Sequence, residues 1–354
     1  MRASLVLRTG IALLLAQIAV WIWVVPAYAV PDCDFAGSVP RSRPHPEAGP
    51  TQVEIALFVF DLISIDSVQQ EFSLDFYVEF QWTDERLGSA VRKAGMRKCR
   101  IPMGDVWHPN MIPLNARTFS TKLPKVLKVN ADGTVEGKQR TIGTFSAPLD
   151  LTDFPLDSQT LKVAFISTEH SPDELTVVAA EAGVAQDFTE PGWSARLRRA
   201  YSGSHEMELI WGSGEEKESV SRFDFEIDVK RDVRYYLWKA FLPLCLIVMI
   251  SWTVFWIDPV HFAIQTGIGT ATMLTVIAFL FSLGHILPKV PYLTRLDIFV
   301  YSSLIFIFFA FIESIVSCTL VANNRAVLAH RMDRWCRALF PFAFGAVIAW
   351  FWWV

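Results

Sequence analysis

Residues 222–257 read RFDFEIDVKRDVRYYLWKAFLPLCLIVMISWTVFWI, and two patterns follow one another in this stretch. Up to residue 231 apolar and polar side chains alternate, and a period of two is typical of a β-strand with one buried face. The inward positions are Phe223, Phe225, Ile227 and Val229, and the outward ones are Arg222, Asp224, Glu226, Asp228 and Lys230. From Tyr235 to Ile257 the side chains are mostly apolar, and a helix of this length crosses a hydrocarbon core of about 30 Å. A strand that continues almost directly into a membrane helix can pass a rotation or tilt between two domains.

Three more apolar stretches follow the first. We therefore predict an all-α transmembrane domain over residues 233–354, with four helices at about 235–257, 262–286, 293–321 and 335–354. The segment 323–337 carries four arginines against one aspartate, so the positive-inside rule assigns it to the cytoplasm. With four spans, the large N-terminal domain and the C-terminus are then both expected outside.

Residues 1–29 have the features of a signal peptide. Arg2 and Arg8 form a basic start, Ile11–Val25 is apolar, and Ala27–Ala29 fits an A-x-A cleavage site. The alternative interpretation is an uncleaved anchor helix. In both cases the residues that follow are expected to be exported.

The composition excludes several classes of protein. Of 354 residues, 52% are hydrophobic and only 19% are charged, which argues against an ordinary soluble domain. The net charge of −4 argues against nucleic-acid binding, because phosphate contacts need clustered lysine and arginine. The sequence contains no P-loop, H-E-x-x-H or G-x-S-x-G motif, and its seven histidines lack zinc spacing, so we expect no enzyme, metal or cofactor.

The exported residues 30–232 are predicted to form an all-β, immunoglobulin-like sandwich. Residues 72–83 give the clearest strand, with outward positions that include Tyr77 and Glu79. The inward positions are Phe72, Leu74, Phe76, Val78, Phe80 and Trp82. Further strands are expected at Val53–Leu62 and Thr160–Thr168.

Four short motifs follow in order: WTDERL at Trp82–Leu87, WHPN at Trp107–Asn110, APLDLTDFPLDSQTL at Ala147–Leu161 and LPKVPY at Leu287–Tyr292. With the predicted domains, they resemble the pentameric ligand-gated ion channels, the Cys-loop receptor superfamily, over about residues 50–354. Ala147 and Leu161 stand where the eukaryotic members have their two loop cysteines, as in the bacterial form.

This resemblance implies a homopentamer in the lipid bilayer of a bacterial inner membrane, with a periplasmic domain. A small-molecule agonist or protons would open a path for inorganic ions. The likeness to bacterial members favours monovalent cations, although the sequence has neither an acidic ring nor the anion-channel Pro-Ala-Arg pattern at the expected place. Asp258 and His261 lie just before it.

The resemblance also implies that the second membrane helix lines the pore. One stripe of that helix has small residues in its lower half and two bulky apolar residues above, and its members are Ala263, Gly267, Ala271, Leu274, Ala278, Phe281 and His285. Rings of Leu274 and Phe281 would close a channel by dewetting. The alternative is that Gly267 and Ala271 only allow helices to pack closely.

Coupling between the domains is implied for one charge cluster. In the family, the arginine at the position of Arg231 pairs with acids that correspond here to Asp157 and Asp66, and these press on the loop that contains Pro288 and Lys289. The alternative is ordinary surface pairing worth about 0–1 kcal/mol.

A ligand site between subunits is implied as well. Tyr77 and Glu79 would contribute from one subunit, and the other would contribute Leu114, Thr168, Glu169, His170, Tyr201 and Trp211. Leu114 and Thr168 replace aromatic rings, so a cation–π box for a quaternary amine is not expected, whereas a small amine or another polar ligand fits. Proton gating is the alternative, through the titratable residues His170, His205, His285 and 215–218.

The remaining expectations concern isolated residues. Cys33 and Cys99 are the exported cysteines, and the sequence leaves open whether they form a disulfide. Glu313, inside the third span, is expected to face the bundle interior in a structural or modulatory role. The alternative functions are a periplasmic sensor or binding module without a pore and, with no motif to support it, a membrane-bound enzyme.

Overall fold

The computed structural model describes residues 30–35, 39–186, 188–208, 217–284 and 290–353. The predicted signal peptide lies outside these residues. The chain divides into two compact units. One consists of Met1–Pro46, Gln81–His108 and Lys125–Gly137, and the other of Glu47–Phe80, Pro109–Pro124 and Lys138–Val354.

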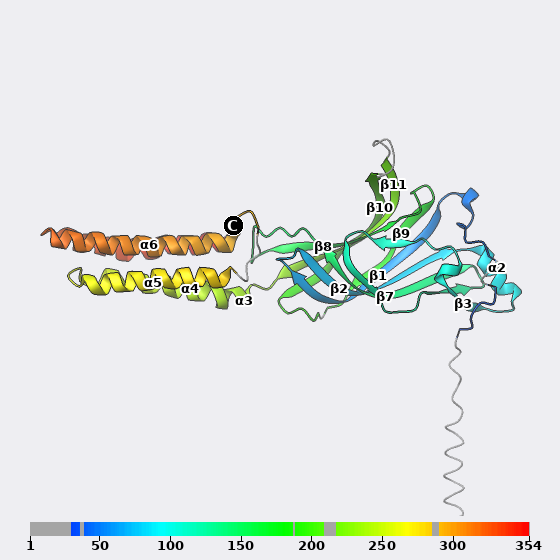
Figure 1. The fold of residues 1–354 in the computed structure, drawn as a ribbon, viewed down its shortest axis with the longest axis horizontal. Helices are drawn as coiled ribbons and strands as arrows, with labels where there is room; N and C mark the ends of the chain where they lie inside the picture. The colour runs from blue at the N-terminus through cyan, green and yellow to red at the C-terminus, as the bar shows by residue number, and fades with distance from the viewer. Residues whose placement is uncertain (1–29, 36–38, 187, 209–216, 285–289, 354) are drawn as a thin grey trace, which may run out of the picture. The chain divides into compact units, whose positions relative to one another are not determined.

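The N-terminal domain is a β-sandwich of two sheets, as predicted (Figure 1). Its strands are β1 (Thr51–Asp66), β2 (Glu71–Thr83), β3 (Lys98–Pro102), β4 (Met111–Pro113), β5 (Ala116–Thr121), β6 (Val126–Asn130), β7 (Thr134–Ser146), β8 (Ser158–Ser167), β9 (Leu175–Val184), β10 (Trp193–Glu208) and β11 (Lys217–Arg231). One sheet has the order β3-β6-β7-β2-β1-β9, with β5 paired to β7, and the other has the order β10-β11-β8-β4. The strands predicted at Val53–Leu62 and Thr160–Thr168 correspond to β1 and β8.

Aromatic side chains from both sheets form the core of the sandwich. On β2, Phe72 and Phe76 are fully buried, and the ring of Phe76 lies 6.3 Å from that of Phe165 on β8. Asp75 alternates with these inward rings and is nevertheless only 9% exposed. Arg140 on β7 covers it, because its Nη2 lies 2.7 Å from the Asp75 carboxylate.

The smaller unit explains two of the sequence motifs. Trp82 and Trp107 pack edge to face, with ring centroids 5.6 Å apart. Asp84 caps helix α2 (Glu85–Lys93) by accepting the backbone N–H of Arg86, and it pairs with the guanidinium of Arg86 at 2.7 Å. These tryptophans and the Asp–Arg pair therefore have structural roles in this unit.

Cys33 and Cys99 belong to the same unit, and the structure joins them by a disulfide with the Cα atoms 5.3 Å apart. The bond links the segment before β1 to β3, which pairs along its whole length with β6.

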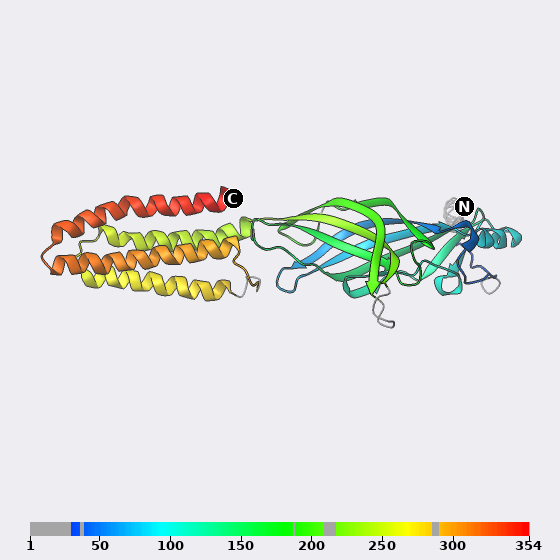
Figure 2. The same ribbon diagram turned by 90° about the horizontal axis from the view of Figure 1, so that it is seen from above.

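Four apolar helices follow the sandwich and lie side by side (Figure 2). They span Arg234–Trp256, Phe262–Leu283, Arg295–Ala322 and Ala326–Trp353. The first combines α3 (Arg234–Tyr236), a π-helical turn at Leu237–Phe241, α4 (Leu242–Trp252) and a 3-10 turn at Thr253–Trp256. The others are α5, α6 and α7. The predicted end of the second helix at residue 286 falls outside the described residues.

The fourth helix begins at Ala326 and not near 335, so most of the predicted cytoplasmic segment 323–337 is helical. Its 28 residues extend over about 42 Å, which exceeds a core of about 30 Å. The first turns can therefore leave the hydrocarbon and keep Arg331 and Arg334 near water. The predicted start near residue 335 was too late, because hydropathy detects only the apolar part of such a helix.

Candidate functional site

The predicted pore stripe lies on one exposed face of α5. Its described members are Ala263, Gly267, Ala271, Leu274, Ala278 and Phe281, and all of them are exposed. Leu274 and Phe281 are 67% and 74% exposed, although both are large and apolar. The opposite face is buried and consists of Gln265, Gly269, Thr272, Val276 and Leu283. His285 lies outside the described residues.

A different glycine makes the close helix contact. A Cβ atom added to Gly269 would clash with the ring of Phe311 on α6, whereas one added to Gly267 would meet nothing within 4 Å. Within one chain, close packing of α5 therefore depends on Gly269. Gly267 is therefore not needed for helix packing within one chain. That the stripe of α5 lines a pore stays a prediction.

Gln265 fixes the rotation of α5, and it was not among the residues predicted to have a role. Its side chain is buried, and Nε2 donates to the backbone carbonyls of Val254 and Ile257 at 3.1 and 2.9 Å. Its Oε1 lies 3.1 Å from Sγ of Cys318 on α6. A glutamine in an apolar run was the available signal, because a buried amide needs partners.

Arg231 is the centre of the predicted coupling cluster. Its Nε and Nη2 donate to the two carboxylate oxygens of Asp157 at 2.7 and 3.2 Å, and both side chains are more than nine-tenths buried. The guanidinium also lies 4.1 Å from the ring centroid of Trp193 and 4.8 Å from that of Phe154. Charge pairing and aromatic contact together hold this cation away from water.

The second predicted acid has another role. Asp66 accepts the backbone N–H groups of Val68 and Gln69, at 2.8 and 2.9 Å, and so closes the turn between β1 and β2. The partner that this turn offers to Arg231 is Ser67, whose Oγ lies 3.0 Å from Nη2. Among the ion pairs of the described residues, none joins Asp66 to Arg231. Pro288 and Lys289 fall outside the described ranges.

The loop that carries the motif at Ala147–Leu161, called the signature loop below, also contacts the start of α6 directly. The backbone N–H groups of Arg295 and Leu296 donate to the carbonyls of Thr152 and Phe154 at 3.0 and 3.1 Å. Arg295 pairs with Asp153 at 2.7 Å. These contacts join the β-domain to the third membrane helix. They were not predicted, because hydrogen bonds between backbone groups do not depend on the type of side chain.

The predicted ligand residues fall on two different sheets. Tyr77 and Glu79 lie on β2, and Glu79 pairs with Lys138 at 2.7 Å. At the edge of the other sheet, Asn110, just before β4, lies 2.8 Å from Glu169 and 3.5 Å from Thr168, which follow β8. The remaining residues on that side are Leu114, which is exposed, and His170, which lies 3.3 Å from Glu174. Trp211 lies outside the described residues.

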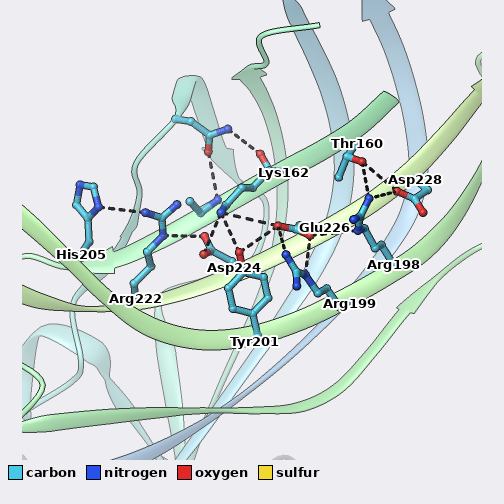
Figure 3. Close-up of polar contacts among 12 residues, drawn as sticks. Thr160, Lys162, Arg198, Arg199, Tyr201, His205, Arg222, Asp224, Glu226 and Asp228 are labelled. Atoms are coloured by element: carbon cyan, nitrogen blue, oxygen red, sulfur yellow. Dashed lines mark hydrogen bonds and ion pairs between the residues drawn. The ribbon is translucent and has the colours of Figure 1, made fainter. Parts of the chain in front are cut away.

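Tyr201 belongs to a charged network on the outer face of β8, β10 and β11 (Figure 3). Its hydroxyl contacts Glu226 and Lys162, each at 3.0 Å, and the guanidinium of Arg199 lies 4.5 Å from its ring centroid. The face of this ring already holds a cation. Tyr201 is therefore poorly placed to bind a cationic ligand.

The same network covers Asp224 and Glu226, two of the residues predicted at outward positions of this strand. They are 4% and 6% exposed, because Arg199 pairs with Glu226 at 2.8 Å and Arg222 pairs with Asp224 at 2.8 Å. Burial of the Glu226 carboxyl raises its pKa, but the hydrogen bonds from Arg199 and Tyr201 outweigh this and hold the pKa below its ordinary value. His205 joins the network through Arg222, at 3.0 Å (Figure 3).

Comparison with known families matches this architecture. The family model for the neurotransmitter-gated ion-channel ligand binding domain matches residues 38–233, and the model for the transmembrane region of the same channels matches residues 240–340. The chain belongs to the pentameric ligand-gated ion channel family. This is a family of ion channels and not of enzymes.

Individual relatives differ in the stimulus that their names state. The chain is 26% identical to a proton-gated ion channel of Gloeobacter violaceus, over 86% of this chain and 83% of that protein. It is 27% identical to a gamma-aminobutyric acid receptor beta subunit of Caenorhabditis elegans, over 74% of this chain and 47% of that subunit. It is 26% identical to a glycine receptor beta subunit of Rattus norvegicus, over 82% of this chain and 60% of that subunit. The chain thus spans about half to 60% of these two receptor subunits.

Proposed function

We propose that five copies of this chain surround an axis and form an ion channel whose pore is lined by α5. The observation that carries the proposal is the exposed stripe of α5, where two large apolar residues, Leu274 and Phe281, are 67% and 74% exposed among the residues that the structure describes. Apolar rings at a pore axis can stop ions by dewetting. Particle averages with five-fold symmetry and stimulus-dependent current in a planar bilayer are expected. A stable monomer or dimer without conductance would favour a pore-less sensor instead.

For the stimulus, protons or a small-molecule agonist act on the exported domain, and acidification is the one to test first. One relative with high coverage carries the name of a proton-gated channel. Burial raises the pKa of Glu190, which lines a cavity of about 920 Å³ together with Asp66, Trp193 and Arg231. Protonation there removes a negative charge from the surroundings of the Arg231 cluster.

Currents recorded over a pH series and over a panel of small amines and amino acids test this assignment. We expect acid-evoked current without any ligand, with a half-activation pH that Glu190→Gln moves. The exposed residue Glu54 offers the control Glu54→Gln. Silence down to about pH 4 excludes protons as the stimulus. Current evoked only by an amine or amino acid would instead favour a small-molecule agonist, with its proposed site at the subunit boundary near Tyr77 and Glu169.

The permeant ions are proposed to be monovalent cations. Asp258, just before α5, is exposed, and its carboxylate accepts the N–H of Val260 at 3.1 Å. Five such carboxylates near one mouth of the pore would favour cations. Reversal potentials in asymmetric sodium chloride should follow the sodium gradient, and Asp258→Asn should reduce this preference. Potentials that follow the chloride gradient would overturn the assignment.

The setting proposed is a bacterial inner membrane, with residues 1–29 removed as a signal peptide and residues 30–232 in the periplasm. The mass of the purified chain should correspond to a start at Val30. A protease added to intact spheroplasts should cut a tag placed after Val354. A protected tag would overturn the proposed topology.

A further inference from the structure

The cavity of about 920 Å³ beside Arg231 has a lining of two parts. Residues of the sandwich, among them Glu190 and Trp193, form the first part. The second part belongs to the start of the first membrane helix and includes Tyr235 and Trp238, which are 52% and 69% exposed. Tyrosine and tryptophan are typical of the surface of a bilayer. The cavity is therefore expected at the level of the lipid headgroups.

Most charged side chains of this cavity already have a partner within the chain. The pairs are Arg231 with Asp157, Arg234 with Asp232 and Glu71 with Arg117, while Asp66 closes its own turn. Two lining residues differ from these, because the ion pairs of the described residues include neither Glu190 nor Lys239. Glu190 is half-buried, and burial raises the pKa of its carboxyl group. Lys239 is exposed. One carboxyl group and one ammonium group are thus available to a ligand.

The two groups follow one another from the sandwich into the membrane. Glu190 lies in the sandwich between β9 and β10, whereas Lys239 lies in the π-helical turn of the first membrane helix. Lys239 comes five residues after the start of that helix at Arg234, which corresponds to a rise of about 7 Å. The acid therefore lies on the water side and the base on the hydrocarbon side. A phosphatidylethanolamine headgroup has the complementary order, with its ammonium group outermost and its phosphate next to the hydrocarbon.

An exposed apolar stripe continues from Lys239 along the same helix. Leu242, Leu246 and Met249 follow it at helical spacing and are 43%, 47% and 46% exposed. The ten residues from Lys239 to Met249 rise about 15 Å, which is half of a hydrocarbon core of about 30 Å. One leaflet of a bilayer has this thickness. The stripe therefore has the length of an acyl chain that starts at the cavity.

We propose that the cavity and the stripe together bind one phosphatidylethanolamine molecule of the leaflet on the side of the sandwich. Its ammonium group donates to the Glu190 carboxylate, its phosphate accepts from Lys239, and an acyl chain lies along Leu242, Leu246 and Met249. A choline headgroup has no N–H donor for the carboxylate, and a glycerol headgroup has no positive charge. Ethanolamine is therefore the preferred headgroup.

The test is binding of phospholipids to the full-length detergent-purified protein, counted as adducts per chain by native mass spectrometry. Three probes have the same dioleoyl chains and differ only in an ethanolamine, choline or glycerol headgroup. We expect the ethanolamine lipid to bind about tenfold more strongly than the other two, since a hydrogen bond to a charged group contributes at least this much. Glu190→Gln should remove the preference, and Lys239→Gln should weaken the binding of all three lipids.

Two exposed charges outside the cavity supply the controls Glu54→Gln and Lys230→Gln, which should change none of the three affinities. Equal binding of the three lipids to the unmodified protein would overturn the proposal, as would an ethanolamine preference that survives Glu190→Gln. A second copy of the chain that covers the stripe would exclude the lipid, and the absence of any bound lipid would show this. The readout is a mass and not a current. Failure of the lipid site is therefore distinguishable from failure of the proposed channel function.

Discussion

Arg231 and Asp157 form a buried bidentate ion pair with N–O distances of 2.7 and 3.2 Å. Arg231 is the last residue of β11, and Asp157 lies in the signature loop. The strand continues into the first membrane helix, which begins at Arg234, and the loop contacts the start of α6. The pair therefore links the strand that leads into the first membrane helix with the loop that contacts α6.

Replacing Arg231 by alanine leaves the Asp157 carboxylate buried without its cation. Breaking a buried pair in this way costs about 3–5 kcal/mol, so we expect a lower melting temperature and a loss of stimulus-evoked current. Thermal unfolding and bilayer currents measure the two effects. The exposed neighbour supplies the control, Lys230→Ala, which should change neither. An Arg231→Ala channel that assembles and gates normally would exclude this latch.

Leu274→Ser should favour the open channel. A hydroxyl at this position hydrates the proposed apolar ring, and we expect current without stimulus or a roughly tenfold shift in sensitivity. Ile277→Ser is the matched control, because Ile277 is also exposed on α5 but lies off the stripe. Unchanged currents from the Leu274 variant, measured in the same bilayers, would remove this residue as the gate.

Two glycines on α5 should respond differently to alanine. Gly269→Ala forces a methyl group into the ring of Phe311, and overpacking of this kind costs about 1–3 kcal/mol. Gly267→Ala meets open space and should leave stability unchanged or improve it slightly. The melting temperatures of the two variants give the comparison. Equal destabilisation would mean that Gly267 also packs closely, against another subunit.

Glu226 should make the exported domain sensitive to acid. Its pKa in the folded state lies below the ordinary value of 4.5, so its stabilising contribution is complete above about pH 4.5 and is lost as the pH falls through the folded-state pKa. Glu226→Gln should lower the melting temperature at neutral pH, and this difference should shrink below pH 4.5. Glu54→Gln is a control on an exposed strand position. A difference that stays constant with pH would contradict this role.

The disulfide between Cys33 and Cys99 joins residues that lie 66 positions apart in the sequence, and it should stabilise the exported domain. Its removal should cost roughly 4 kcal/mol, because the unfolded chain gains freedom. Mass spectrometry of the unreduced protein should find three alkylated cysteines, namely Cys245, Cys318 and Cys336, and five after reduction. Alkylation of all five without reductant would show that Cys33 and Cys99 are free.

Local periodicity was enough to predict most of the fold. Alternation at 72–83 and 222–231 specified strands with one buried face, and four apolar runs specified four helices, because side-chain direction repeats with a period that belongs to each element. The motif at Ala147–Leu161 indicated the family because its residues are contiguous in the chain and can be recognised without the structure. The stripe that includes Leu274 is exposed as expected, since helical spacing alone decides which residues share a face.

Only the tertiary structure decided which charges meet. Asp66 binds its own turn while Ser67 reaches Arg231, Glu226 is buried under arginines from a neighbouring strand, and Glu313 finds Asp333 on another helix. The packing glycine is Gly269 and not Gly267, because Phe311 comes from a distant part of the chain. Periodicity specifies the face of a residue, whereas its partners depend on which elements pack together, and that arrangement is set by the whole core.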